Sequence, residues 1–116
     1  MIIKKDQFDI LSLNAKEAFI TSMVNFLKNQ HAEISNISNQ DLHKIISIQI
    51  NKASKYGFTR SSTIASFIVT SFAMGENFDM DFAEANKILK TDGDELQKSH
   101  DLENWVTKIF STLKSQ

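Results

Sequence analysis

Turn-forming residues are scarce in this chain, which contains no proline and only three glycines, Gly57, Gly75 and Gly93. β-Sandwiches and barrels need frequent turn residues, so an all-β fold is disfavoured. Each glycine lies between two stretches in which apolar residues recur at helical spacing. The glycines therefore mark helix ends rather than a phosphate-binding loop, and the sequence predicts an all-α protein.

The size of the chain fits one domain, because 116 residues can bury one core but not two. Hydrophobic residues make up 41% and charged residues 23% of the sequence, as in ordinary globular proteins. We expect a single helical domain over residues 1–116, folded as a compact bundle of about five helices.

Charge and composition exclude several function classes. The net charge is −1, so no global basic field attracts nucleic acid or an anionic membrane. The absence of cysteine excludes disulfides, thiolate metal sites and a cysteine nucleophile. No apolar run approaches the ~20 residues of a membrane helix, and residues 1–6 lack a signal-peptide core. A cytoplasmic location is expected.

The longest predicted helix spans residues 6–30 and is apolar on two sides. One stripe consists of Phe8, Leu11, Ala15, Phe19, Met23 and Phe26, and the roughly opposite stripe consists of Ile10, Leu13, Ile20, Val24 and Leu27. Such a helix is either covered on both sides or offers one side to another protein. The second stripe is the predicted partner-binding surface.

The next helix has clear signals at both ends. Ser38 is a good N-cap, and Ile37 and Leu42 have the spacing of a hydrophobic staple. Gly57 fits the left-handed position that follows a helix, with Phe58 folding back on the last turn. A helix is therefore predicted from about residue 39 to about residue 55.

A central helix is predicted at about residues 60–74, capped by Thr59 or Ser61. From Ser61 to Gly75 there is no charged residue, whereas a surface helix normally carries charges on its wet side. Its apolar stripe consists of Ile64, Phe67, Ile68, Ser71 and Phe72. We expect neighbouring helices to pack on most sides of it.

The remaining third of the chain predicts a loop and two helices. Residues 76–81 form the loop, with Phe78 anchored in the core, and Asp79 or Asp81 caps a short helix through about residue 89. After a turn at residues 91–94, a last helix begins at Asp94 or His100. Its predicted inward side consists of Leu102, Trp105, Val106, Ile109, Phe110 and Leu113.

No constellation of reactive residues is visible, so we predict no catalytic residue, no metal, no cofactor and no enzyme. The three histidines, His31, His43 and His100, are scattered and lack ligand spacing. The acidic residues Asp79, Asp81 and Glu84 are explained as charges near a helix N-terminus.

A calcium loop is suggested by Asp92, Asp94 and Glu103, which match positions one, three and twelve of an EF-hand. Leu96 and Gln97 stand where a ligand and a glycine belong, so the match fails where it is most specific.

A helix-turn-helix DNA-binding motif is the alternative functional reading of residues 39–74. The usual pattern places apolar residues six and nine positions after the glycine, where this chain has Thr63 and Ser66. The apolar residues come one position later, and Arg60 is the single base of the second helix. DNA readout needs more positive charge, so nucleic acid is not the expected partner.

Three stretches carry a family resemblance: residues 53–59, residues 64–67 and residues 74–79. They are similar to small uncharacterised helical bacterial proteins encoded beside type VI secretion effectors and other polymorphic toxins. The residues that carry the structural motif are Tyr56, Gly57, Phe58, Phe67, Gly75, Phe78 and Asp79. The resemblance covers roughly residues 45–110, including an Ile88–Leu89 pair, and departs at Met80, where relatives often have proline.

The resemblance implies a common fold and an accessory role for a secreted toxin, as an adaptor, a co-chaperone or an immunity protein. We therefore expect a non-enzymatic interaction module whose partner is a toxin, an effector or its loading apparatus. A homo-oligomer is left open by the sequence.

Overall fold

The computed structural model describes residues 13–114, and residues 1–12 and 115–116 lie outside the described part. Six α-helices and one 3₁₀ helix make up this part, and it contains no β-strand. In chain order they are α2 (Leu13–Gln30), η1 (Ala32–Asn36), α3 (Asn39–Lys55), α4 (Ser61–Met74), α5 (Phe78–Asp81), α6 (Ala83–Lys90) and α7 (Glu95–Lys114). The predicted all-α bundle is confirmed. No helix in residues 13–114 is long and apolar enough to cross a membrane.

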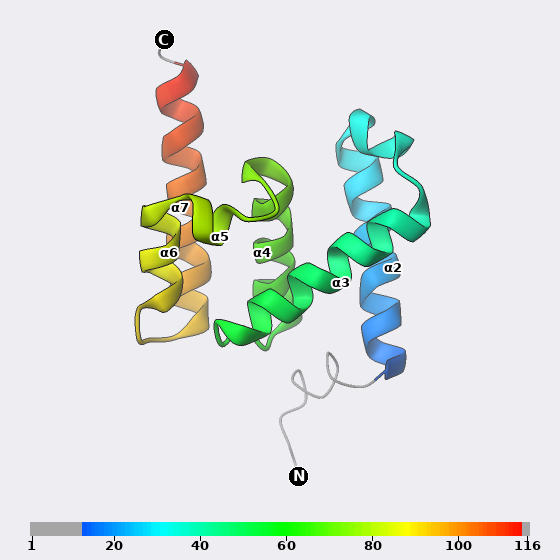
Figure 1. The fold of residues 1–116 in the computed structure, drawn as a ribbon, viewed down its shortest axis with the longest axis horizontal. Helices are drawn as coiled ribbons and strands as arrows, with labels where there is room; N and C mark the ends of the chain where they lie inside the picture. The colour runs from blue at the N-terminus through cyan, green and yellow to red at the C-terminus, as the bar shows by residue number, and fades with distance from the viewer. Residues whose placement is uncertain (1–12, 115–116) are drawn as a thin grey trace.

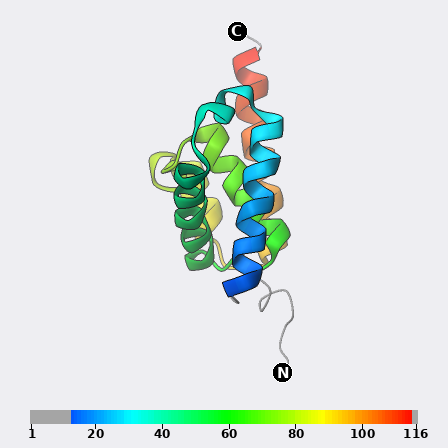
Figure 2. The same ribbon diagram turned by 90° about the vertical axis from the view of Figure 1, so that its right-hand side faces the viewer.

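The helices form two layers. α2, α4 and α7 lie side by side in one layer, and α3 crosses in front of it next to the short helices α5 and α6 (Figure 1). In Figure 2, α2, α4 and α7 overlap on one side and α3 lies on the other. The shortest dimension of the molecule is 19 Å, as expected for two helix layers about 10 Å apart.

α4 is the central helix, as the sequence predicts. It contacts α2 and α7 within its own layer and α3 and α5 in the other layer. Ile64, Phe67 and Ile68 are fully buried on the side that faces the second layer. Burial of the side of α4 that faces the second layer therefore explains in part why residues 61–74 carry no charge.

Aromatic rings fill the centre of the core and explain much of the high phenylalanine content. The ring of Phe67 lies 5.0 Å from that of Phe78 and 5.8 Å from that of Phe58, measured between centroids. Phe78 stacks at 6.4 Å on Trp105 of α7, which also meets Phe82 at 5.2 Å. One set of tilted, edge-on and stacked ring contacts thus links α4, α5 and α7.

Both predicted ends of α3 are confirmed. The Ser38 hydroxyl accepts a 3.1 Å hydrogen bond from the Asp41 amide. At the other end Gly57 has a φ of +92°, and the Phe58 amide donates a 3.0 Å bond to the Ala53 carbonyl. This is a Schellman ending, with Phe58 fully buried beyond it.

The start of α4 differs from the prediction. Arg60 occupies the N-cap position, and neither Thr59 nor Ser61 caps the helix with its side chain. The carboxylate of Glu95, in the first turn of α7, accepts hydrogen bonds from the Thr59 amide and hydroxyl and from the Thr63 hydroxyl. A residue distant in sequence therefore binds both the segment that leads into α4 and the Thr63 hydroxyl in its first turn.

Residues 76–81 are not a simple loop, because residues 78–81 form the helical turn α5. Phe78 is fully buried, which confirms its predicted anchoring role. Neither Asp79 nor Asp81 caps α6, whose N-cap is Phe82 without a side-chain bond. Asp79 points into the protein instead, because Lys52 and Tyr56 of the neighbouring α3 segment bind its carboxylate.

The last helix is inward-facing only in part. Leu102 and Trp105 are buried, but Phe110 and Leu113 are 45% and 57% exposed. The prediction that all six apolar residues face inward is wrong for these two. The last turns of α7 rise past the ends of α4 and α6, so no described helix covers them (Figure 1).

Candidate functional site

The apolar stripe of α2 that was predicted to bind a partner lies largely in the core. Ile20 and Leu27 are fully buried and Val24 is nearly so, because α3 and α4 both pack on this side of the helix. The prediction of an exposed stripe is wrong for these three residues. Ile10 lies outside the described residues, and only the backbone of Leu13 is described.

An exposed uncharged surface exists on α4 instead. Six residues at helical spacing share the side of α4 that points away from α3, and all are partly or fully exposed: Ser62, Ala65, Ser66, Val69, Phe72 and Ala73. We call this surface the α4 face. α2 and α7 flank it, and no described helix lies over it.

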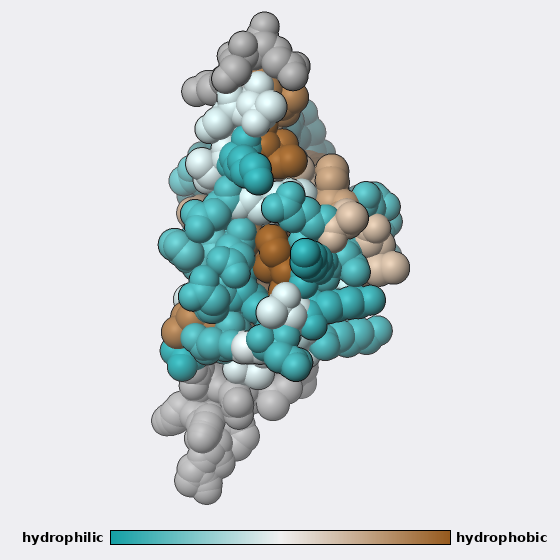
Figure 3. All heavy atoms as spheres, turned by 90° about the vertical axis from the view of Figure 1, so that its left-hand side faces the viewer, coloured by the Kyte–Doolittle hydropathy of each residue, from teal (hydrophilic) through white to brown (hydrophobic). Residues whose placement is uncertain are grey.

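A groove runs between the α4 face and α7. Its first part is lined by Ser66, Val69, Thr70, Ala73, Glu103, Val106 and Thr107, and its continuation by Val106, Thr107, Phe110, Ser111 and Leu113. The two hollows adjoin at Val106 and Thr107, and the second is lined by α7 alone; together we call them the α4–α7 groove. Apolar atoms also reach the surface along the C-terminal part of α7 in Figure 3.

The groove carries a single charged side chain among its lining residues. Glu103 lies at one end, where Oε2 accepts a 2.9 Å hydrogen bond from the Ser66 hydroxyl. Lys108, the next charged residue of α7, faces Glu84 of α6 at 3.9 Å and so points away from the groove. The groove is thus apolar along most of its length and acidic at one end.

A second feature is a buried polar cluster around Asp79. The Tyr56 hydroxyl donates a 2.8 Å hydrogen bond to Oδ2 of Asp79, and Lys52 Nζ lies 2.7 Å from Oδ1. Lys52 also donates to the Glu76 carbonyl at 2.7 Å, and the side-chain amide of Asn86 donates to the backbone carbonyl of Asp79 at 2.9 Å. The cluster thereby ties α3 to α5 and α6.

The environment of Tyr56 disfavours its ionised form. Burial first, and then the hydrogen bond to Asp79 and the negative charge of Asp79, together raise the pKa of Tyr56 to about 12. A phenol with a raised pKa keeps its proton at neutral pH and cannot act as a base there. Tyr56 serves as a hydrogen-bond donor in this cluster.

The cluster around Asp79 is closed. Only 4% of the Asp79 side chain is exposed; Oδ2 accepts the hydrogen bond from Tyr56, and Oδ1 faces the Lys52 ammonium group in an ion pair. A substrate atom would have to displace Lys52 or Tyr56 to reach it. The motif that carries the family resemblance therefore forms a helix ending, aromatic core contacts and this ion pair, all of which stabilise the fold.

The other polar candidates from the sequence do not converge. His43 pairs with Glu17 of α2 at 2.9 Å, while His31 and His100 lie on separate elements. Asp81 and Glu84 are exposed beside the buried Asp79. Within the described residues, no group of three or more histidine or acidic side chains is placed to hold a metal ion.

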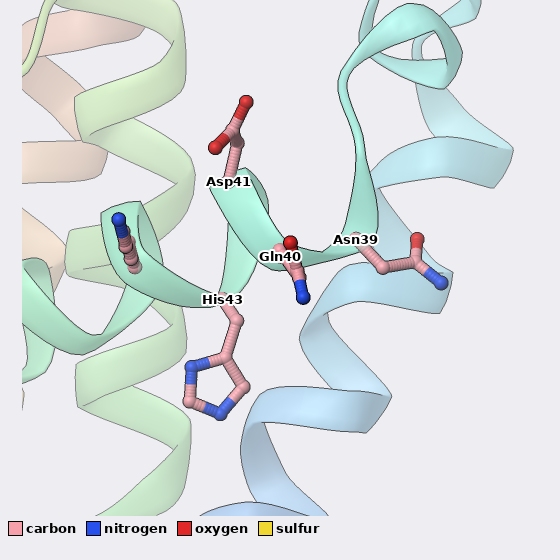
Figure 4. Close-up of a pocket in the computed structure, with 5 residues that line it drawn as sticks. Asn39, Gln40, Asp41 and His43 are labelled. Atoms are coloured by element: carbon pink, nitrogen blue, oxygen red, sulfur yellow. The ribbon is translucent and has the colours of Figure 1, made fainter.

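A shallow hollow at the start of α3 is lined by Asn39, Gln40, Asp41, His43 and Lys44. Figure 4 shows that Asp41 and His43 point to opposite sides of the helix. A binding or catalytic site needs polar groups that converge on one point. This hollow provides no such arrangement.

The α3–turn–α4 segment has the order of a helix-turn-helix but a different exposure. In a DNA-binding motif the second helix presents its N-terminal residues to the groove of the duplex. Here the Glu95 carboxylate sits at that N-terminus and forms a 3.2 Å ion pair with Arg60. Its negative charge occupies the place where a DNA phosphate would bind.

Comparison of the chain with protein-family models, with curated proteins and with solved structures finds no match. The resemblance to proteins encoded beside secreted toxins stays a prediction. The α4–α7 groove is the candidate site because apolar side chains are exposed along it.

Proposed function

We propose that the protein is a non-enzymatic interaction module that binds another protein through the α4–α7 groove. The observation that carries this proposal is the exposure of Phe110 and Leu113 on the last turns of α7, next to the hollow that α7 forms with α4. Adjoining apolar residues at the surface of a small protein are typical of binding sites. Aromatic side chains such as Phe110 are enriched at such interfaces.

The kind of ligand follows from the shape of the surface. A groove between two adjacent helices fits a third helix, which would lay an apolar side between α4 and α7. Small residues that line the groove, such as Ser66 and Ala73, allow the backbone of a partner helix to approach closely. The preferred ligand is thus an amphipathic helix rather than an extended strand or a small metabolite.

The biological partner is proposed from the family resemblance alone. We propose a secreted toxin, a type VI secretion effector or its loading apparatus as the client, with this protein as adaptor, co-chaperone or immunity factor. The buried cluster around Asp79 offers no open polar group for catalysis, which supports a binding role over an enzymatic one.

The alternative function, DNA-binding regulation through α3 and α4, has weaker support. Arg60 is the only basic residue in the sequence from Thr59 to Met74, and it is paired with Glu95. A regulator of this type should bind its own promoter in a salt-dependent manner. Absence of retardation at low salt would remove this alternative.

A pull-down with matched variants tests the proposed function. The tagged chain would be expressed with the products of its adjacent genes, next to the variants Phe110→Ser and Ile48→Ser. Ile48 is 53% exposed on α3, outside the groove, so it controls for general loss of surface hydrophobicity. We expect one defined product to copurify with the wild type and the Ile48 variant but not with the Phe110 variant.

Two results would count against the proposal. Retention of the client by the Phe110 variant would place the binding surface elsewhere. Failure to recover any adjacent product, with the wild type folded, would remove the client role. The immunity form of the proposal further predicts that the chain rescues cells from one toxin domain.

A further inference from the structure

We propose that the helix bound in the α4–α7 groove carries a basic residue on its apolar side, which pairs with Glu103, and apolar residues that pack on Leu96 and Phe110. The inference rests on the proposed function, because it gives the chemistry of the partner that the same groove binds. That partner is an amphipathic helix of another protein, with lysine or arginine at one defined position. Residue spacing along α7 and the surroundings of the Glu103 carboxylate support it.

Leu96, Glu103 and Phe110 form a stripe along α7. Successive members are seven positions apart, close to two helical turns, so the three residues share one side of the helix. Leu96 and Phe110 are each 45% exposed, and Glu103 is exposed between them. A helix packed along α7 meets such a stripe with residues of its own that are seven positions apart. Because the stripe is apolar at both ends, the pattern is the same for either direction of the partner.

The Glu103 carboxylate is oriented but not neutralised. The Ser66 hydroxyl of α4 donates a 2.9 Å hydrogen bond to Oε2, which fixes the carboxylate beside the groove. A hydroxyl group carries no charge, and no basic side chain within residues 13–114 forms an ion pair with Glu103. A cationic group of a partner can therefore bind the other oxygen, Oε1, without displacing Ser66.

Neighbouring charges leave Glu103 to set the charge preference of the groove. Glu95 pairs with Arg60 at 3.2 Å, and Lys108 faces Glu84 at 3.9 Å. α4 itself contributes no charged side chain. A partner helix that covers the groove removes water from Glu103, so a basic residue opposite restores a favourable contact, whereas an acidic residue is repelled.

Fluorescence anisotropy of the full chain with three synthetic helical peptides tests this inference. The peptides share one apolar side, with leucine seven positions before and after a central residue that is lysine, glutamine or glutamate. We expect the lysine peptide to bind the wild type about fivefold or more tightly than the glutamate peptide, with the glutamine peptide between them. Added salt should narrow this difference, because it screens exposed charges.

Charge variants of the protein assign the preference to Glu103. Glu103→Lys should reverse the order of the lysine and glutamate peptides, and Glu103→Gln should bring their affinities together. Asp81→Lys makes the same change in net charge on α5, in the other layer, and should keep the wild-type order. Glu103 and Asp81 are both exposed, and circular dichroism checks that each variant retains its helices.

The outcomes separate this inference from the proposed function. Equal affinity of the three peptides for the wild type, or a preference for glutamate, overturns the inference. If Phe110→Ser then still weakens all three, the groove keeps its role as a helix-binding site. If Phe110→Ser weakens none, the peptides bind elsewhere and both proposals fail. No binding of the lysine peptide to the folded wild type also overturns the inference, whereas the pull-down with adjacent gene products still tests client binding.

Discussion

The hydroxyl of Tyr56 donates a 2.8 Å hydrogen bond to the carboxylate of Asp79, which joins the end of α3 to the turn α5. Because Lys52 binds the other oxygen of the same carboxylate, removal of Asp79 takes the acceptor from the Tyr56 hydroxyl and the ion-pair partner from Lys52, which keeps its bond to the Glu76 carbonyl. We expect Asp79→Ala to lower the free energy of unfolding by about 2–3 kcal/mol, the cost of leaving partly buried donors unpaired. Urea denaturation measures this directly.

The matched control is Asp81→Ala, two positions further along the same helical turn. Asp81 is exposed, and substitutions at such sites usually change stability by less than about 0.5 kcal/mol. Equal effects of the two variants would show that the buried cluster contributes nothing specific to the fold.

The single tyrosine of the chain makes the Asp79 cluster accessible to a direct titration. Burial first, and then the hydrogen bond and charge of Asp79, raise the pKa of Tyr56 to about 12. We expect tyrosinate absorbance to appear well above the ordinary midpoint of about 10. In Asp79→Asn the midpoint should fall part of the way back, because burial remains. A wild-type midpoint near 10 would contradict the closed cluster.

The raised pKa of Tyr56 also predicts how stability depends on alkaline pH. The folded state holds the phenol proton up to about pH 12, whereas the unfolded chain releases it near pH 10. The contribution of Tyr56 to stability is therefore complete below about pH 10 and is lost as the pH rises from about 10 to about 12. Urea midpoints across this range should fall more steeply for the wild type than for Tyr56→Phe, which removes this one titration and leaves the lysines unchanged.

Local signals in the sequence predict the helix ends that are made by neighbours in the chain. Ser38 and Gly57 act within a few residues of themselves, so their spacing to Asp41 and Phe58 is enough to identify an N-cap and a Schellman ending. The acceptor at the start of α4 could not be predicted in this way. Glu95 is more than thirty residues away, and only the packing of α7 beside α4 brings it there.

The candidate site was missed for a related reason. The uncharged run from Ser61 to Met74 predicts burial, and the structure leaves one side of α4, the α4 face, partly or fully exposed. Whether the opposite side is covered depends on the number of helix layers, which hydrophobic spacing along one helix does not encode. The small residues of the α4 face, such as Ser62 and Ala73, were the available signal, since they recur at helical spacing opposite Ile64 and Phe67.

Gly57 offers a test of backbone conformation without a packing effect. Its φ is +92°, and a Cβ added there would meet no atom within 4 Å. The cost of Gly57→Ala therefore comes from the left-handed backbone alone, and we expect a loss of about 1–2 kcal/mol of stability. Gly57→Asn should lose less, because asparagine tolerates positive φ better than alanine. Thermal and urea unfolding give both values, and an alanine variant as stable as the wild type would contradict the assigned ending.

Glu95 provides the corresponding test for a helix start that depends on tertiary contact. Its carboxylate is 11% exposed and accepts bonds from Thr59 and Thr63 while pairing with Arg60. We expect Glu95→Ala to cost about 2 kcal/mol, since it removes charge-assisted bonds at the positive end of α4. Glu84→Ala, which breaks an exposed pair with Lys108, should cost less than about 0.5 kcal/mol.

A double-mutant cycle between Glu95→Ala and Thr63→Ala decides whether the contact itself is responsible for the loss at Glu95. Because the one proton of the Thr63 hydroxyl is shared between Glu95 and the Arg60 carbonyl, its removal should cost less once Glu95 is absent. The two losses should therefore be less than additive in unfolding experiments on the four proteins. Full additivity would mean that Glu95 stabilises the start of α4 only through its charge or its other partners, and not through Thr63.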